Sequence, residues 1–92
     1  MAAITIVIPV FNEAESIEDT VLKLDSAFQA SKHAFEIIVV DDGSTDDTGA
    51  RARRTTARVI VHPTNKGYGN ALLTGVRNAT HPWIGITDAD GT

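Results

Sequence analysis

The sequence predicts an α/β fold, a Rossmann-like parallel sheet in which strands and helices alternate in the order β-α-β-α-β-α-β. Two observations lead to this prediction. Short runs rich in Ile and Val are apolar without interruption, which is typical of parallel strands buried on both faces. The segments between these runs carry apolar residues at the spacing of amphipathic helices. Because parallel strands are joined by right-handed crossovers, the alternation predicts a doubly wound sheet.

The first strand is expected over residues 4–10 and the second over residues 36–40. A helix lies between them, and its apolar residues recur at helical spacing: Ile17, Val21, Leu24 and Phe28. Asn12 is predicted to be the N-cap of this helix, because its side-chain oxygen can accept a hydrogen bond from an unpaired backbone N–H.

The rest of the chain repeats the pattern with shorter helices. Ser44 and Asp47 have the spacing of a capping box and predict the start of a short helix. Residues 58–61 form the third predicted strand and residues 83–87 the fourth. The third helix lies between these strands and is marked by Ala71, Leu72, Gly75, Val76 and Ala79.

The expected strand order is 3-2-1-4, which puts a topological switch between the first and fourth strands. Ligands of such sheets bind outside the carboxyl ends of the strands at that switch. Residues 11–13 and 88–90 would then flank one crevice, with Asp41 and Asp42 one strand away. The fourth strand would lie at an edge and expose Trp83, Ile84 and Ile86. An exposed apolar edge predicts self-association through this C-terminal strand.

Composition narrows the class of protein. The 92 residues are enough for one domain, residues 1–92. The net charge of −4 argues against nucleic acid as a partner, and the absence of cysteine excludes a disulfide framework. The N-terminus lacks the features of a signal peptide, and no apolar run approaches the roughly 20 residues that span a bilayer. We therefore expect a cytoplasmic chain, with any membrane association supplied by sequence beyond residue 92.

Acidic pairs follow the second and fourth predicted strands. Asp88 and Asp90 suit a hard divalent cation, which prefers oxygen ligands. Asp41 or Asp42 could accept a hydrogen bond from a ribose hydroxyl or a base N–H. An ordinary polar loop is the alternative interpretation for both pairs. Two acidic strand ends in one small α/β unit favour a site for a nucleotide and a metal.

Residues 65–70 precede the third helix, where a phosphate could bind with Lys66 adding positive charge. The alternative is that Gly67 and Gly69 serve only the turn and close packing of the helix. The segment is not a dinucleotide fingerprint, because the third glycine is missing. The three histidines show no metal-ligand spacing.

Two other functions fit an acidic doubly wound domain. A nucleotidyltransferase shares the acidic strand ends and the metal, but it usually carries a glycine-rich basic loop where this chain has residues 11–13. A receiver-type signalling domain, which is not an enzyme, places its acidic pair after the first strand, whereas Asp41 and Asp42 follow the second. Both remain alternatives at this point.

Four segments taken in order, residues 8–13, 39–48, 65–71 and 88–91, resemble family 2 glycosyltransferases. The last two resemble the polyprenyl-phosphate branch, which includes dolichyl-phosphate mannose and glucose synthases. The resemblance spans the chain and implies the N-terminal, nucleotide-sugar-binding half of a GT-A fold. It also implies transfer of a sugar from a UDP- or GDP-sugar with Mg²⁺ or Mn²⁺, with a polyprenyl or dolichyl phosphate as candidate acceptor.

The resemblance implies roles for the matching residues. Pro9, Phe11 and Glu13 would line the base and ribose. One acid of the Asp41–Asp42 pair would contact the base, with Asp42 favoured. Lys66 is retained as a further nucleotide-binding candidate.

For the last motif, the resemblance implies that Asp88 and Ala89 contact the nucleotide diphosphate and that Asp88 and Asp90 bind the metal, with Asp90 the more direct ligand. The acceptor half and the general base of the family follow this point in the sequence. No catalytic residue is therefore assigned, and the 92 residues alone are expected to show no turnover.

Overall fold

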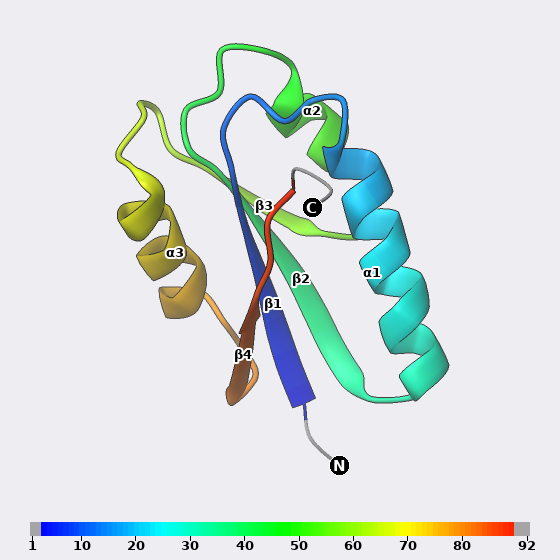
Figure 1. The fold of residues 1–92 in the computed structure, drawn as a ribbon. Coiled ribbons are helices and arrows are strands. Elements are labelled where there is room, and N and C mark those ends of the chain that lie inside the picture. The colour runs from blue at the N-terminus through cyan, green and yellow to red at the C-terminus, as the bar shows by residue number, and fades with distance from the viewer. Residues whose placement is uncertain (1–2, 90–92) are drawn as a thin grey trace.

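The computed structural model describes residues 3–89 and contains one four-stranded parallel sheet with helices on both faces (Figure 1). The strands are β1 (Ala3–Val10), β2 (Ala34–Asp41), β3 (Arg58–Val61) and β4 (Trp83–Ile86). The helices are α1 (Ile17–Ser31), α2 (Thr48–Ala52) and α3 (Tyr68–Arg77). The strand order is β3-β2-β1-β4, so the predicted fold class and strand order are confirmed.

The two faces of the sheet have separate apolar cores, which explains the uninterrupted apolar runs. In Figure 1, α1 and α2 cover one face and α3 covers the other. On the first face, Ile6 and Ile8 of β1 pack with Ile17 and Val21 of α1. The residues of the opposite core are Val7, Ile38, Val40 and Ala71. Burial of each large side chain contributes about 1.5–3 kcal/mol, so both faces of β1 and β2 stabilise the fold.

Helix α3 lies very close to the sheet. A Cβ atom added at Gly75 would lie 2.3 Å from Cγ1 of Val7, a distance that no side chain tolerates. Glycine is therefore required where α3 crosses β1, because any larger residue would push the helix away from the strand.

Two predicted helix caps are wrong. Asn12 is not the N-cap of α1, which starts at Ile17 after Ser16. Asn12 instead adopts a left-handed conformation (φ 54°), and its Oδ1 accepts a hydrogen bond from Thr45 N at 2.8 Å. Ser44 does not open α2, because its Oγ accepts a hydrogen bond from Asn12 N at 2.9 Å. Both side chains hold the β1–α1 and β2–α2 loops together, and this tertiary role replaces local capping.

Strand β4 lies at an edge of the sheet, as predicted. Its side chains Trp83 and Ile86 are 63% and 53% exposed. Self-association through this edge stays a prediction. Among residues 3–89, no helix has both the length and the apolar character needed to cross a bilayer.

Candidate nucleotide site at the carboxyl ends of the strands

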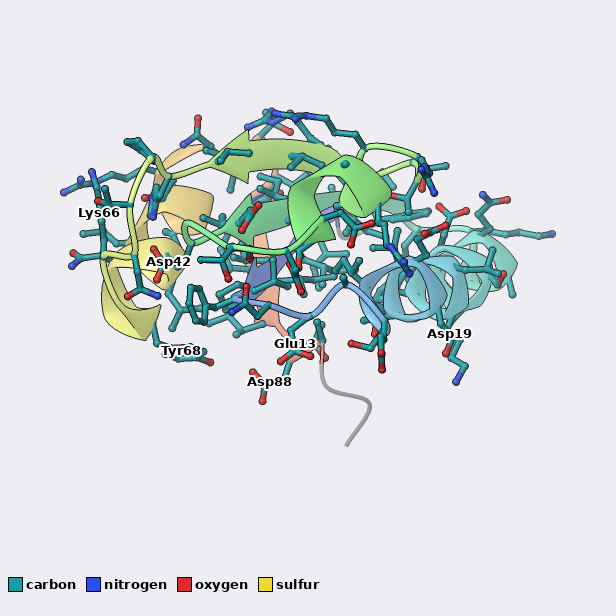
Figure 2. All side chains as sticks on the ribbon, turned by 90° about the horizontal axis from the view of Figure 1, so that it is seen from above. Glu13, Asp19, Asp42, Lys66, Tyr68 and Asp88 are labelled. Atoms are coloured by element: carbon teal, nitrogen blue, oxygen red, sulfur yellow. The ribbon has the colours of Figure 1, made fainter. Side chains whose placement is uncertain are left out.

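The loops that follow the strands meet at one end of the sheet, which Figure 2 shows from above. Two cavities open there. One has a volume of about 210 Å³ and is lined by Pro9, Phe11, Glu13, Tyr68, Asp88 and Ala89. The other has a volume of about 170 Å³ and is lined by Pro9, Val10, Phe11, Asp42, Asn65, Gly67, Tyr68 and Ala71. Because Pro9, Phe11 and Tyr68 line both, the cavities adjoin, and we call them together the strand-end opening.

The opening is apolar where its two cavities meet and acidic toward its ends. Phe11 and Tyr68 are about half exposed there, at 43% and 56%. Glu13 and Asp88 line the first cavity, and Figure 2 shows them close together. Asp42 lines the second. An aromatic surface between two acidic positions suits a ligand with a flat apolar group and a polar, cation-associated tail.

Asp42 is the buried acid of the opening, with 4% of its surface exposed. Its Oδ1 accepts hydrogen bonds from Lys66 N at 2.9 Å and pairs with His62 Nδ1 at 2.8 Å, while its Oδ2 accepts a hydrogen bond from Gly67 N at 2.9 Å. Burial raises the pKa of Asp42, but the hydrogen bonds from His62, Lys66 and Gly67 outweigh burial and hold the pKa below its ordinary value. The carboxyl group is therefore ionised and acts as an acceptor at neutral pH.

Asp41 points to the other face of the sheet, because successive side chains near the strand end alternate. Its Oδ1 accepts a hydrogen bond from Ser44 N at 3.0 Å. A Cβ atom added at Gly49 would lie 2.6 Å from Asp41 Oδ2, so this carboxylate packs directly against α2. The alternation separates the two adjacent acids and relieves their repulsion. Asp42 lines the opening, and neither cavity of the opening is lined by Asp41.

Lys66 contributes its backbone N–H to Asp42, as described above. Its side chain is exposed, and Figure 2 places it at the outer rim, away from Glu13 and Asp88. Gly67 supplies the positive φ of 97° that starts α3, and added Cβ atoms at Gly67 and Gly69 would meet nothing within 4 Å. Close helix packing therefore does not account for these two glycines.

The start of α1 and the residue before it, Ser16, hold the segment that follows β4. The carbonyl oxygen of Ala89 accepts hydrogen bonds from the hydroxyls of Ser16 and Thr20, the latter at 3.4 Å. Ser16 Oγ also lies 3.3 Å from Glu13 Oε2. Ala89 is buried, whereas the neighbouring Asp88 is exposed beside Glu13. These contacts fix the backbone of the acidic segment and direct Asp88 to the opening.

The oxygen donors in the opening fit a hard divalent cation. Glu13 and Asp88 line one cavity and offer only carboxylate oxygens, the ligands that Mg²⁺ and Mn²⁺ prefer. The predicted second ligand, Asp90, lies outside the described residues. Within residues 3–89, no group of three or more His, Asp or Glu side chains is arranged to hold a metal.

Two residues at or beside the opening, His62 and Tyr68, were not singled out from the sequence. His62 is buried beside Asp42, although the spacing of the histidines in the sequence indicated no role for it as a metal ligand. Its position was a usable signal, because His62 directly follows β3 as Asp42 directly follows β2. Tyr68, at the start of α3, lines both cavities of the opening.

The sequence model described as glycosyl transferase family 2 matches residues 5–92. The chain belongs to glycosyltransferase family 2. The chain is 40% identical over 90 residues to an uncharacterized glycosyltransferase of Mycobacterium tuberculosis (strain ATCC 25618 / H37Rv). The aligned region covers 98% of this chain and 38% of the relative.

Two further relatives carry names that include a substrate. An undecaprenyl-phosphate 4-deoxy-4-formamido-L-arabinose transferase of Pseudomonas fluorescens is 34% identical, over 95% of this glycosyltransferase chain and 27% of the relative. A dolichol-phosphate mannosyltransferase of Pyrococcus furiosus is 32% identical, over 95% and 25%. The chain therefore spans well under half the length of each of these relatives.

Solved structures of other glycosyltransferases share the fold. Mannosyl-3-phosphoglycerate synthase of Rubrobacter xylanophilus superposes with a TM-score of 0.87 at 21% identity, over 97% of this chain and 31% of that one. Glucosyl-3-phosphoglycerate synthase of Mycobacterium tuberculosis, in complex with Mn²⁺, UDP and phosphoglyceric acid, gives 0.77 at 31% identity, over 96% and 33%; it is also known with Mg²⁺ and UDP. A mannosyltransferase of Pyrobaculum calidifontis with GDP-Man and Mn²⁺ gives 0.76 at 34% identity, over 95% and 27%.

Proposed function

We propose that the protein binds a nucleotide-diphosphate sugar in the strand-end opening and transfers the sugar to an acceptor. The observation that carries this proposal is the convergence of Asp42, Glu13 and Asp88 on one opening with an aromatic surface between them. The position at the topological switch of a parallel sheet supports it, because ligands of such sheets bind there.

In this proposal the base lies in the cavity lined by Asp42, against Phe11 and Pro9. Asp42 accepts a hydrogen bond from a ring N–H of the base. The ribose and diphosphate then extend toward Glu13 and Asp88. UDP in one structural neighbour and GDP-Man in another support either a uridine or a guanosine donor.

The acidic end of the opening is proposed to work with a divalent cation. Asp88, together with Asp90, would hold Mg²⁺ or Mn²⁺, which supplies positive charge against the diphosphate of the leaving group. The protein's own part is to orient the carboxylates, and the hydrogen bonds of Ser16 and Thr20 to the Ala89 carbonyl hold the backbone next to Asp88 in place. Complexes of structural neighbours with Mn²⁺ or Mg²⁺ support a metal-dependent reaction.

The acceptor is proposed to be a polyprenyl phosphate. The names of the Pseudomonas and Pyrococcus relatives support this class. The acids of the opening are assigned to the base, the ribose and the cation, so none is left to remove the acceptor proton. We therefore propose that the 92 residues alone bind donor but do not turn over.

Calorimetry with UDP and GDP, each with and without Mn²⁺, tests the donor part of the proposal. We expect binding of one nucleotide that Mn²⁺ strengthens and that Asp88→Asn makes insensitive to Mn²⁺. Asp19→Asn is the matched control, because Asp19 is an exposed acid on α1, away from the opening in Figure 2. Absence of binding to both nucleotides, or equal effects of the two substitutions, would contradict the proposal.

A further inference from the structure

A buried histidine connects the base-binding acid to α3. His62 follows β3 and is 7% exposed. Its Nδ1 lies 2.8 Å from Asp42 Oδ1, and its Nε2 lies 2.8 Å from Oγ1 of Thr74 in α3. Both ring nitrogens are therefore used within the protein. The three side chains form a continuous hydrogen-bonded series, which we call the Asp42–His62–Thr74 series.

The hydrogen bonds of Asp42 leave acceptor capacity on only one of its oxygens. A carboxylate has about four acceptor positions, two on each oxygen. On Oδ1 both are filled, by His62 Nδ1 and Lys66 N, whereas on Oδ2 only Gly67 N is bound. Since Asp42 lines the smaller cavity, a ligand N–H entering that cavity is directed to Oδ2.

His62 acts on the opening only through Asp42. The ring lines neither cavity of the opening, so it does not contact a ligand there. Its second partner, Thr74, belongs to the same helix as Tyr68 and Ala71, which form a wall of the smaller cavity. The series thus fixes the position of the Asp42 carboxylate relative to α3.

We infer that His62, held by Thr74, is a positioning residue that donates from Nδ1 to Asp42 and thereby presents Asp42 Oδ2 to the nucleotide base. This inference rests on the proposed function. A simple role in joining α3 to the sheet would affect every ligand of the opening equally. The positioning role affects only ligands that carry a base, because the diphosphate end of the opening is formed by other residues.

Substitutions at position 62 separate these roles. His62→Asn places an amide nitrogen near the position of Nδ1, so it retains a donor to Asp42. His62→Gln places one near Nε2 instead, and His62→Phe removes both nitrogens. Affinity is measured for the nucleotide that the wild type prefers and for inorganic pyrophosphate, both with Mn²⁺.

We expect His62→Phe and His62→Gln to weaken nucleotide binding by about tenfold or more, because a hydrogen bond to an ionised partner is lost. Pyrophosphate binding should not change, and His62→Asn should bind nucleotide more tightly than the other two variants. Unchanged nucleotide binding by the Phe variant, or equal loss of nucleotide and pyrophosphate by a folded variant, would overturn the inference. Equal nucleotide affinities of the Asn, Gln and Phe variants would overturn it too.

Two further measurements cover failure to fold and failure of the proposed function. Thr74→Val replaces the hydroxyl with a methyl group of similar size. We expect it to lower nucleotide affinity without changing pyrophosphate affinity. If the wild type binds neither UDP nor GDP, the proposed function fails, and nitrogen NMR of the His62 ring still tests the donor assignment. A protonated Nδ1 that responds to Asp42→Asn supports the assignment, and an unprotonated Nδ1 overturns it.

Discussion

Glu36 and Asp42 lie near the two ends of β2, on the same face of the sheet, and they show how similar hydrogen bonding can serve different purposes. Glu36 Oε2 accepts hydrogen bonds from Thr5 Oγ1 at 2.7 Å and from the N and Oγ1 of Thr80, both at 2.6 Å. Its Oε1 lies 3.7 Å from Nη1 of Arg58. Glu36 therefore fastens the α3–β4 connection to the sheet.

The two acids differ in whether they line a cavity of the strand-end opening. The partners of Glu36 belong to β1, β3 and the α3–β4 connection, and it lines no cavity of the strand-end opening. Asp42 has as many partners but also lines a cavity. Both carboxylates are hydrogen-bonded within the protein. Glu36, near the amino ends of the strands, therefore has a structural role, whereas Asp42, at the carboxyl ends, is a candidate binding group. Hydrogen-bond count does not distinguish the two; position relative to the topological switch does.

The largest expected effect is on nucleotide affinity, which should respond to substitution of Asp42 but not to substitution of Glu36. Asp42→Asn replaces an acceptor oxygen with an amide and should weaken nucleotide binding by roughly tenfold to a hundredfold, with or without Mn²⁺, because the proposed partner is the base. Glu36→Gln should leave nucleotide affinity unchanged. Calorimetry on both variants, after circular dichroism has shown that each is folded, makes the comparison. Similar losses in the two variants would remove the functional distinction between the acids.

The second prediction concerns folding stability at the other end of β2. Glu36→Ala removes the acceptor of Thr5 and Thr80 and should lower the free energy of unfolding by about 1–3 kcal/mol. Urea unfolding of the wild type and the variant measures this change. Gln29→Ala is the matched control, because it removes a hydrogen bond to Asp25 at the exposed surface of α1. A loss no larger than that of the control would show that the hydrogen bonds of Glu36 do not stabilise the fold.

The sequence predicted the parts of this comparison that depend on periodicity and topology. Strand order followed from short crossovers between apolar runs, and the order brought Glu13, Asp42 and Asp88 to one end of the sheet. Side-chain partners were not predictable in this way. Asn12 and Ser44 have good local capping patterns, but their observed partners lie more than thirty positions away.

His62 was missed for the same reason. Its partners Asp42 and Thr74 are 20 and 12 positions away, and no local spacing links them. The alternation that turns Asp41 and Asp42 to opposite faces was predictable in principle, because side chains alternate along a strand. The choice of Asp42 over Asp41, however, also depended on α2 packing against Asp41, which only the structure shows.

A third, smaller effect is expected where α1 holds the acidic segment. Ser16→Ala combined with Thr20→Val removes the hydroxyls that bind the Ala89 carbonyl. Nucleotide affinity with Mn²⁺ should fall a few-fold, because the carboxylates are held less firmly, while affinity without metal should not change. Ser31→Ala is the control, since its hydroxyl donates to Phe28 O at 2.7 Å in the last turn of the same helix. Equal losses with and without Mn²⁺ would contradict a role in orienting the proposed metal ligands.

The smallest effect is expected in the pH dependence of stability, and it applies to both acids. Burial raises the pKa of Glu36, but the hydrogen bonds from Thr80 and Thr5 and the nearby Arg58 hold it below the ordinary value of 4.5, and Asp42 likewise lies below 3.8. Since each pKa is lower in the folded state, the unfolded state binds more protons in the acidic range. The stabilisation is therefore fully present above the ordinary carboxyl pKa and is lost as the pH falls through the lower folded pKa.

Urea unfolding at a series of pH values checks this window. Glu36→Gln and Asp42→Asn should each flatten the fall in stability below the ordinary carboxyl pKa and leave the slope near neutral pH as it is in the wild type. Adding a fixed concentration of nucleotide should raise the stability at acidic pH more in the wild type and in Glu36→Gln than in Asp42→Asn, because of the two acids only Asp42 is proposed to contact the ligand. Equal protection of all three proteins would place the ligand away from Asp42.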